Sequence, residues 1–416
     1  MPPPGTSASE ALSSEESSLA YPGWRVALAA HLGTMVSFAS LLVFTFGIFL
    51  KPLTAEFAWS REEVSRALAI AAMTVAAVSP FLGWALDRWG PRPVVLPCFV
   101  LFAAGLAALS RLSGHLWELY SAFFVIGLAG NGTTQMGYGG AVASWFTRRR
   151  GLALACVLMG VGVGSIVNPI LAERCIETLG WRSAYLAMAV LALALGIPPT
   201  AAWVRRREVT GLGRRKAARG VRKELLSREY GVLVVVLFLS SIAANGTLAH
   251  MAAHLTDRGM RPSDAAVATA VLGGANLAGR LLTGWLLDRL FGPHLSFWLL
   301  ILMAAGFALL TVADSMPLAI FAAVLVGLGL GGEADVTPYL LTRYFGLESF
   351  SVLYGVTWTF YAVGGGAGPV VFGRVFDVSG SYNVVLHSAA AITVVAAVLM
   401  FAMRRYPSGE GRFEEL

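Results

Sequence analysis

Residues 83–91 read Gly-Trp-Ala-Leu-Asp-Arg-Trp-Gly-Pro, and residues 284–293 read Gly-Trp-Leu-Leu-Asp-Arg-Leu-Phe-Gly-Pro. Three further pairs recur in the same order at an offset of 199 or 200 residues: Trp145-Phe146 with Tyr344-Phe345, Asn168-Pro169 with Gly368-Pro369, and Leu179-Gly180 with Ser379-Gly380. Four landmarks at a near-constant spacing indicate that one structural unit occurs twice in the chain.

The composition predicts that this unit is built from membrane helices. Hydrophobic residues make up 56% of the chain and charged residues 13%, against roughly 45–50% and 25% in soluble domains. Apolar segments long enough to cross a bilayer follow one another. We place twelve spans at 24–50, 64–86, 94–112, 116–146, 152–171, 184–204, 230–255, 265–287, 295–313, 317–344, 350–375 and 384–403.

The expected fold is an all-α membrane protein with twelve transmembrane helices, arranged as two six-helix bundles related by pseudo-two-fold symmetry. The bundles are expected at 21–204 and 230–405, joined by a basic cytoplasmic linker at 205–229. The ends are expected to be cytoplasmic tails, with 1–20 disordered and 406–416 short. Residues 1–20 lack the basic and apolar regions of a signal peptide.

The charge pattern sets the expected orientation. The net charge is +7, and the basic residues gather in alternate loops, which favours a topology signal over nucleic-acid binding. Both termini are therefore placed in the cytoplasm of a multi-pass protein of the plasma membrane, the inner membrane if bacterial. The three cysteines show neither metal-ligand spacing nor a disulfide framework.

Arg280 is a cation well inside an apolar helix. The next charges, Asp288 and Arg289, lie about 12 Å further along, so Arg280 is too deep to reach the membrane surface. A charge at this depth predicts a site for an anionic ligand. The alternative is an internal ion pair with Glu333 or Asp335, and the sequence leaves both open.

Glu333 and Asp335 are the candidates for carrying a proton. They lie about 12–15 Å along their span from Arg343, near the middle of the membrane. A desolvated carboxylate suits proton transfer, but each could equally belong to a permanent ion pair. The sequence does not distinguish between the two residues.

Other polar residues are candidates for contact with the same ligand. Asn245 and Tyr361 lie at a depth similar to that of Arg280, although an interhelical hydrogen bond is the usual role of such residues. His250 and His254 are four residues apart, as a metal site would require, but no third ligand is evident. His250 is expected to bond substrate or titrate, and no metal or cofactor is expected.

Two motifs resemble those of a known family. The pattern Gly-x-x-x-Asp-Arg-x-Gly-x-Arg stands complete from Gly83 to Arg92. An aromatic-Phe-x-x-Arg-Arg-x-Leu-Ala motif stands at 145–153, followed by glycine-rich residues 159–165. The chain resembles the major facilitator superfamily, in particular the branch of monocarboxylate transporters and bacterial oxalate/formate antiporters.

The resemblance implies roles for particular residues. Arg280 matches the arginine that holds the substrate carboxylate, and Asn276 stands where animal members carry an aspartate, so it cannot carry the proton. The eleventh span lacks the lysine of oxalate antiporters, which favours a single substrate carboxylate. Paired charges at the cytoplasmic ends of the second and eighth spans imply gating, with ordinary helix-end placement as the alternative: Asp87, Arg88, Arg92, Asp288 and Arg289.

The expected function is secondary active transport of a small monocarboxylate of the lactate or pyruvate type, by alternating access in symport with a proton. Organic-anion antiport and drug efflux on the same fold are the competing transport functions. A receptor or sensor is a further alternative, and no enzyme chemistry is indicated. The resemblance implies a monomer whose partners are the substrate, the proton and the bilayer.

Overall fold

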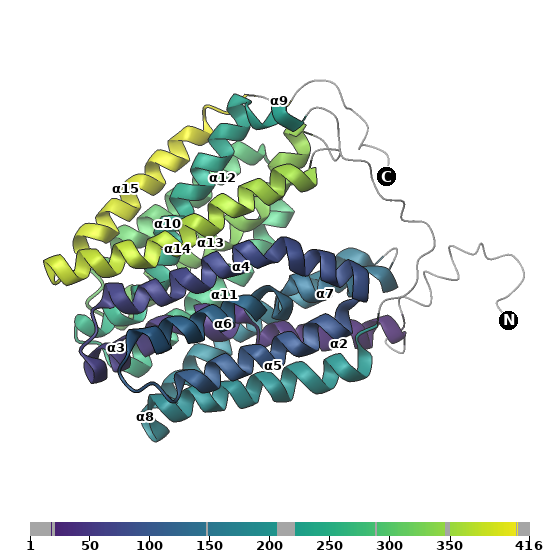
Figure 1. The fold of residues 1–416 in the computed structure, drawn as a ribbon. Helices are drawn as coiled ribbons and strands as arrows, with labels where there is room; N and C mark the ends of the chain where they lie inside the picture. The colour runs from purple at the N-terminus through teal and green to yellow at the C-terminus, as the bar shows by residue number, and fades with distance from the viewer. Residues whose placement is uncertain are drawn as a thin grey trace, which may run out of the picture. The chain divides into compact units, whose positions relative to one another are not determined.

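The computed structural model describes residues 18, 21–146, 149–205, 221–287, 289–345, 350–404 and 406. The predicted tails, apart from Ser18 and Tyr406, and most of the predicted linker lie outside these residues. The first part of the chain forms α2 (Pro22–Met35), the π-helix η1 (Phe38–Val43), α3 (Phe46–Phe57), α4 (Arg61–Trp89), α5 (Pro91–Leu109), α6 (Leu116–Thr133), α7 (Gln135–Trp145) and α8 (Arg150–Trp203). The second part forms α9 (Val221–Leu225), α10 (Arg228–Asp257), α11 (Pro262–Leu287), α12 (Gly292–Leu310), α13 (Met316–Phe345), α14 (Phe350–Ser379) and α15 (Asn383–Met400) (Figure 1).

The predicted all-α membrane fold is confirmed. Within the described residues, nine helices are long and apolar enough to cross a membrane, and no strand occurs. One of the nine, α8, turns at Gly180, where φ is +80°, and so holds the fifth and sixth predicted spans. The pair α6–α7 coincides with the fourth predicted span, and α14 with the eleventh.

The chain divides into two compact units. Unit 1 takes in the described residues of Met1–Trp59 and Arg66–Leu212, and unit 2 takes in Ser60–Ser65 and the described residues of Gly213–Leu416. The first turn of α4 thus belongs to unit 2, whereas the rest of that helix belongs to unit 1.

Unit 1 is packed through glycines and broken helices. A Cβ at Gly160 of α8 would lie 2.2 Å from the His31 carbonyl oxygen, so α8 and α2 touch along their backbones. The chain leaves the α-helix after Met35 and continues as η1, and α6 ends at Thr133 before an extended Thr134. The two breaks meet where the Phe38 N–H donates to Thr133 Oγ1 at 3.0 Å.

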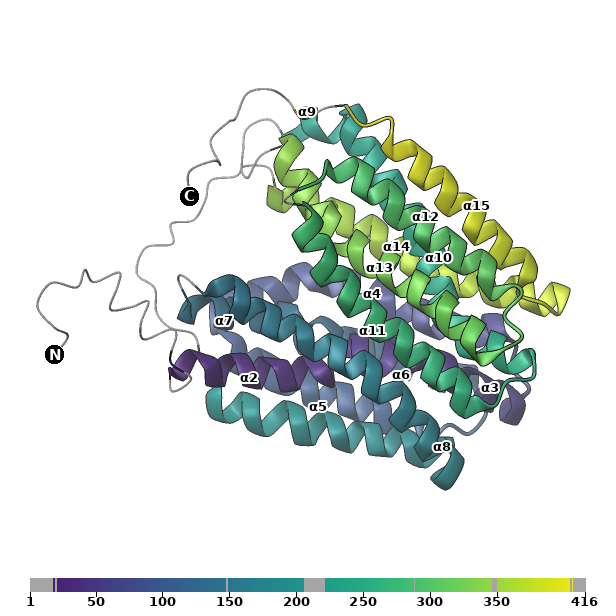
Figure 2. The same cartoon turned by 180° about the vertical axis from the view of Figure 1, so that it is seen from behind.

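Unit 2 has two close helix pairs, α10 with α14 and α11 with α13 (Figures 1 and 2). A Cβ at Gly368 of α14 would lie 2.3 Å from the Ile242 carbonyl oxygen on α10. A Cβ at Gly331 of α13 would lie 2.0 Å from the Asn276 carbonyl oxygen on α11. Backbones can approach this closely only where side chains are absent. The glycines therefore determine at which residues the paired helices of unit 2 contact each other.

Candidate functional site

Arg280 and Asn276 lie on α11, next to the glycine contact with α13. Both side chains are half-buried. Gly279 packs against the carbonyl oxygen of Leu328, and Gly331 packs against that of Asn276. Because the α11 backbone contacts α13 at residues 276 and 279, the position of Arg280 is fixed by packed helices and not by a loop.

Glu333 follows Gly331 by two residues and is only 4% exposed. The hydroxyl of Ser240 on α10 is hydrogen-bonded to its Oε1 atom. The same hydroxyl lies 2.9 Å from the Val236 carbonyl oxygen and 3.1 Å from that of Leu237. A small cavity beside Glu333 is otherwise lined mainly by apolar side chains, so this carboxyl group lies in surroundings of low polarity.

Asn245 and Tyr361 connect α10 to α14. The Asn245 amide nitrogen lies 3.5 Å from the Tyr361 hydroxyl and also donates to the Ser241 carbonyl at 3.0 Å. Ser241 Oγ donates to the Tyr361 carbonyl at 2.7 Å. The Tyr361 hydroxyl also lies within electrostatic range of both Glu333 and Arg280. Side chains from four helices of unit 2 therefore form one polar group, which we call the Arg280 group: Asn245, Arg280, Glu333 and Tyr361.

His250 follows Asn245 by five residues on α10, and both of its ring nitrogens contact protein atoms outside the Arg280 group. Nδ1 is 2.8 Å from the Tyr382 hydroxyl, and Nε2 is 2.9 Å from the Pro369 carbonyl oxygen. His254 Nε2 is 2.9 Å from the Leu310 carbonyl oxygen. No three histidine, cysteine or acidic side chains among the described residues gather as metal ligands do.

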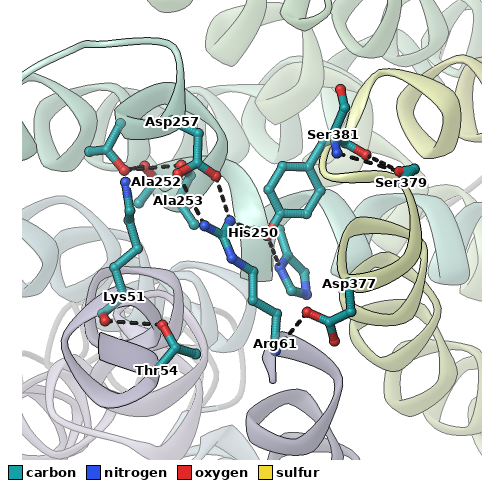
Figure 3. Close-up of polar contacts among 12 residues, drawn as sticks. Lys51, Thr54, Arg61, His250, Ala252, Ala253, Asp257, Asp377, Ser379 and Ser381 are labelled. Carbon is teal, nitrogen blue, oxygen red and sulfur yellow. Dashed lines mark hydrogen bonds and ion pairs between the residues drawn. The ribbon is translucent and has the colours of Figure 1, made fainter. Parts of the chain in front are cut away.

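A second polar cluster surrounds Arg61, the first residue of α4. The guanidinium makes two hydrogen bonds to Asp257, at 2.6 and 3.0 Å (Figure 3). It makes a third to the Tyr382 hydroxyl, at 2.6 Å. It also lies 3.7 Å above the centre of the Phe376 ring. Asp377 accepts from the backbone N–H of both Arg61 and Glu62. We call these residues the Arg61 cluster: Arg61, His250, Asp257, Phe376, Asp377 and Tyr382. The partners of Arg61 in this cluster lie 196 residues or more further along the chain, so no local sequence pattern predicts it.

The predicted gating residues that the structure describes lie at or beside helix ends. Arg92 donates to the carbonyl oxygens of Ala201 and Ala202 in the last turn of α8, where a cation is favoured by the helix dipole. Arg88 is exposed, and the Arg289 guanidinium lies 3.7 Å above the Trp285 ring. The side chains of Asp87, Asp288 and Asp335 lie outside the described part of the molecule.

The chain matches known transporters over most of its length. The family model of the Major Facilitator Superfamily matches residues 32–369. Monocarboxylate transporter 13 of Rattus norvegicus is 28% identical over 92% of this chain and 89% of its own length. Monocarboxylate transporter 11 of Mus musculus is 28% identical over 87% and 83%. These relatives confirm the resemblance drawn from the sequence.

A solved structure shares the fold. The crystal structure of a bacterial homolog of the human lysosomal transporter Spinster superposes with a TM-score of 0.70 over 91% of this chain and 96% of that one, at 16% identity. With the family match, this likeness places the chain among membrane transporters and not among enzymes. The chain belongs to the major facilitator superfamily.

Proposed function

We propose that this protein transports small monocarboxylates of the lactate or pyruvate type across the plasma membrane, or the inner membrane of a bacterium, in symport with protons. The observation that carries the proposal is the Arg280 group, in which one guanidinium and one buried carboxyl group lie within electrostatic range of a hydrogen-bonded pair of neutral side chains. The names of the rat and mouse relatives support the substrate class.

In this proposal Arg280 binds the substrate carboxylate. A guanidinium presents a planar pair of donors to a carboxylate and stays protonated throughout a pH cycle. Asn276, one turn earlier on α11, and the Asn245–Tyr361 pair would bond the remaining polar atoms of the substrate. One fixed cation matches one carboxylate.

Glu333 would carry the coupled proton. The Ser240 hydroxyl has a single hydrogen but three acceptors within reach, the carbonyls of Val236 and Leu237 and Glu333 Oε1. A protonated Glu333 would donate to Ser240 Oγ and leave the hydroxyl hydrogen for Val236. The contacts are thus satisfied best by the neutral acid, as a proton carrier requires. Asp335 stays a second candidate.

Transport would proceed by alternating access of two six-helix bundles, with both termini and the linker at 205–229 in the cytoplasm and with a monomer as the working unit. Asp87 with Arg88 and Arg92, and Asp288 with Arg289, would control opening at the cytoplasmic ends of α4 and α11. The bond from Arg92 to the end of α8 supports a role in holding helix ends together.

The test is uptake of radiolabelled L-lactate into proteoliposomes under an imposed inward proton gradient. Arg280→Ala is expected to lose about 2–5 kcal/mol of binding free energy, which is at least about 30-fold in apparent affinity. Arg174→Ala is the matched control, because Arg174 is 74% exposed and pairs only with its neighbour Glu177 among the contacts described. Equal uptake by native protein and Arg280→Ala would contradict the assigned site.

Glu333→Gln tests the coupling separately. The variant is expected to lose stimulation by the proton gradient while it still exchanges internal for external lactate, because exchange requires no net proton movement. Glu177→Gln serves as the control. If lactate moves only against another organic anion in the native protein, antiport replaces symport.

A further inference from the structure

The Arg61 cluster fixes the protonation state of His250. A carbonyl oxygen can only accept, so the 2.9 Å contact between His250 Nε2 and the Pro369 carbonyl places a hydrogen on Nε2. Ser65 Oγ also lies 3.1 Å from Nε2, and it donates its own hydrogen to the Arg61 carbonyl at 2.7 Å. Ser65 therefore also accepts from Nε2.

The other nitrogen must accept. Tyr382 donates its hydroxyl hydrogen to His250 Nδ1 at 2.8 Å, while its oxygen accepts from the Arg61 guanidinium at 2.6 Å. A ring with hydrogen on Nε2 and a lone pair on Nδ1 is neutral. The chain of bonds from Asp257 through Arg61 and Tyr382 to His250 is complete only with this neutral ring.

The same bonds hold residues 60–65 in unit 2. The Arg61 residue is 9% exposed, with its guanidinium bonded to Asp257 and stacked on Phe376. A Cβ at Gly373 would lie 2.8 Å from the Arg61 carbonyl group and from the Glu62 nitrogen, so the α14 backbone lies directly against the segment. Asp377 holds both backbone N–H groups at the start of α4.

A proton on Nδ1 would disrupt this arrangement. The charged ring has two donors and no acceptor, so the Tyr382 hydroxyl would lose the acceptor of its hydrogen. Two cations, His250 and Arg61, would then converge on one phenol oxygen. Among the groups around the ring, Asp257 is engaged by Arg61 and Asp377 by the α4 backbone, and His254 bonds Leu310. Asp257 acts on His250 electrostatically in favour of a charged ring, but Arg61, which is bonded to Asp257, acts in the opposite sense.

We propose that His250 is a proton-binding site that controls the docking of residues 60–65, so that binding of a proton releases the segment. Linkage requires the converse as well: release of the segment frees Tyr382 and lets the ring bind a proton more tightly. Acid therefore favours the released state. The contacts of His250 include no member of the Arg280 group, and the proposal does not depend on the identity of the transported substrate.

The test is hydrogen–deuterium exchange of the full-length protein in lipid nanodiscs between about pH 8 and about pH 5, the range in which histidine switches operate. After correction for the chemical exchange rate, protection of the amides of 61–65 is expected to decrease as the pH is lowered. The decrease is expected to be about tenfold per pH unit below the pKa of the His250 ring in the released state. His250→Gln offers an amide N–H to Pro369 and a carbonyl to Tyr382 without titrating, so its protection should not change with pH. His387→Gln, at an exposed histidine on α15, should behave as native.

Two results would overturn the proposal. One is protection of 61–65 that is independent of pH in the native protein, or that depends on pH equally in His250→Gln. The other comes from nitrogen NMR of the histidine rings in the native protein, which needs no variant. A neutral-pH signal for His250 with hydrogen on Nδ1, or with both nitrogens protonated, contradicts the bonding pattern.

Discussion

Glu56 and Asp257 stand 201 residues apart at equivalent positions of the repeat, yet they are used differently. In unit 1, Glu56 accepts from the Trp181 indole at 2.6 Å and from Arg182 at 2.5 Å, and the Glu56 and Arg182 side chains are 40% and 43% exposed. In unit 2, Asp257 pairs with Arg61, and these side chains are 26% and 10% exposed. Both halves of the repeat carry a carboxylate at this position. In unit 1 it forms an exposed ion pair, whereas in unit 2 it forms a largely buried ion pair within the Arg61 cluster.

A second contrast lies deeper in the two units. Thr133 of unit 1 accepts the Phe38 N–H next to a helix break, whereas its equivalent 200 residues later, Glu333, is bonded to Ser240 between helices that run on without interruption. At the 201-residue offset Arg280 corresponds to Ser79, which accepts from Asn131. At these two positions of the repeat, unit 1 has a neutral side chain and unit 2 has an ionisable one.

The largest effect in this comparison is expected from Asp257→Ala. Removing one partner of a buried ion pair leaves a charge without compensation, and the partial exposure of Asp257 reduces the cost to roughly 3 kcal/mol of unfolding free energy. Chemical unfolding in detergent measures it. The double variant Arg61→Leu with Asp257→Leu should recover much of the loss, since no charge is then left buried. Glu56→Ala should cost clearly less, and equal losses at the two positions would remove the contrast.

Gly331→Val and Gly160→Val should have effects of intermediate size. Each side chain would meet a carbonyl oxygen of a neighbouring helix, and overpacking of this kind costs about 1–3 kcal/mol. If the two variants lower the melting temperature by similar amounts, close glycine packing contributes equally to both units, whereas buried charge differs between them. Gly284→Ala is the control, because a Cβ there meets nothing within 4 Å, and a loss as large as that of Gly331→Val would argue against steric packing as the cause.

The smallest effect concerns pH and Glu56. Hydrogen bonds from Trp181 and Arg182 lower the pKa of Glu56 below its usual value. The group therefore stabilises unit 1 at pH values above its unfolded pKa of about 4.3, and this contribution is lost as pH falls through the lowered pKa. Glu56→Gln should lower the melting temperature slightly at about pH 7 and less at about pH 3. A difference that grows toward acid would contradict this assignment.

The fold was predictable from the sequence because apolar length and a repeated loop motif are properties of the chain itself. Arg280, Asn245, Tyr361 and Glu333 could be named in advance for a related reason: a polar residue inside an apolar span stands out. The structure adds what links them, including the hydroxyl of Ser240, a residue that is unremarkable in the sequence.

The Arg61 cluster could not be predicted in this way. An arginine next to two glutamates at the start of a helix looks like any membrane-surface charge. Its burial depends on Asp257, which lies 196 residues away, and on Tyr382, 321 residues away. The break between α2 and η1 was equally hidden, since neither Val36 nor Ser37, where it occurs, is a proline or a glycine.

The hydrogen bonds that Asp377 accepts from two backbone N–H groups have a consequence for which substitutions evolution can tolerate in this region. A contact made through the main chain does not depend on which side chain stands at position 62, so these two hydrogen bonds can survive a substitution there. Position 373 is more restricted, because any side chain there would push the two segments apart. Related sequences that keep this docked segment should therefore preserve an acidic residue at 377 and glycine at 373.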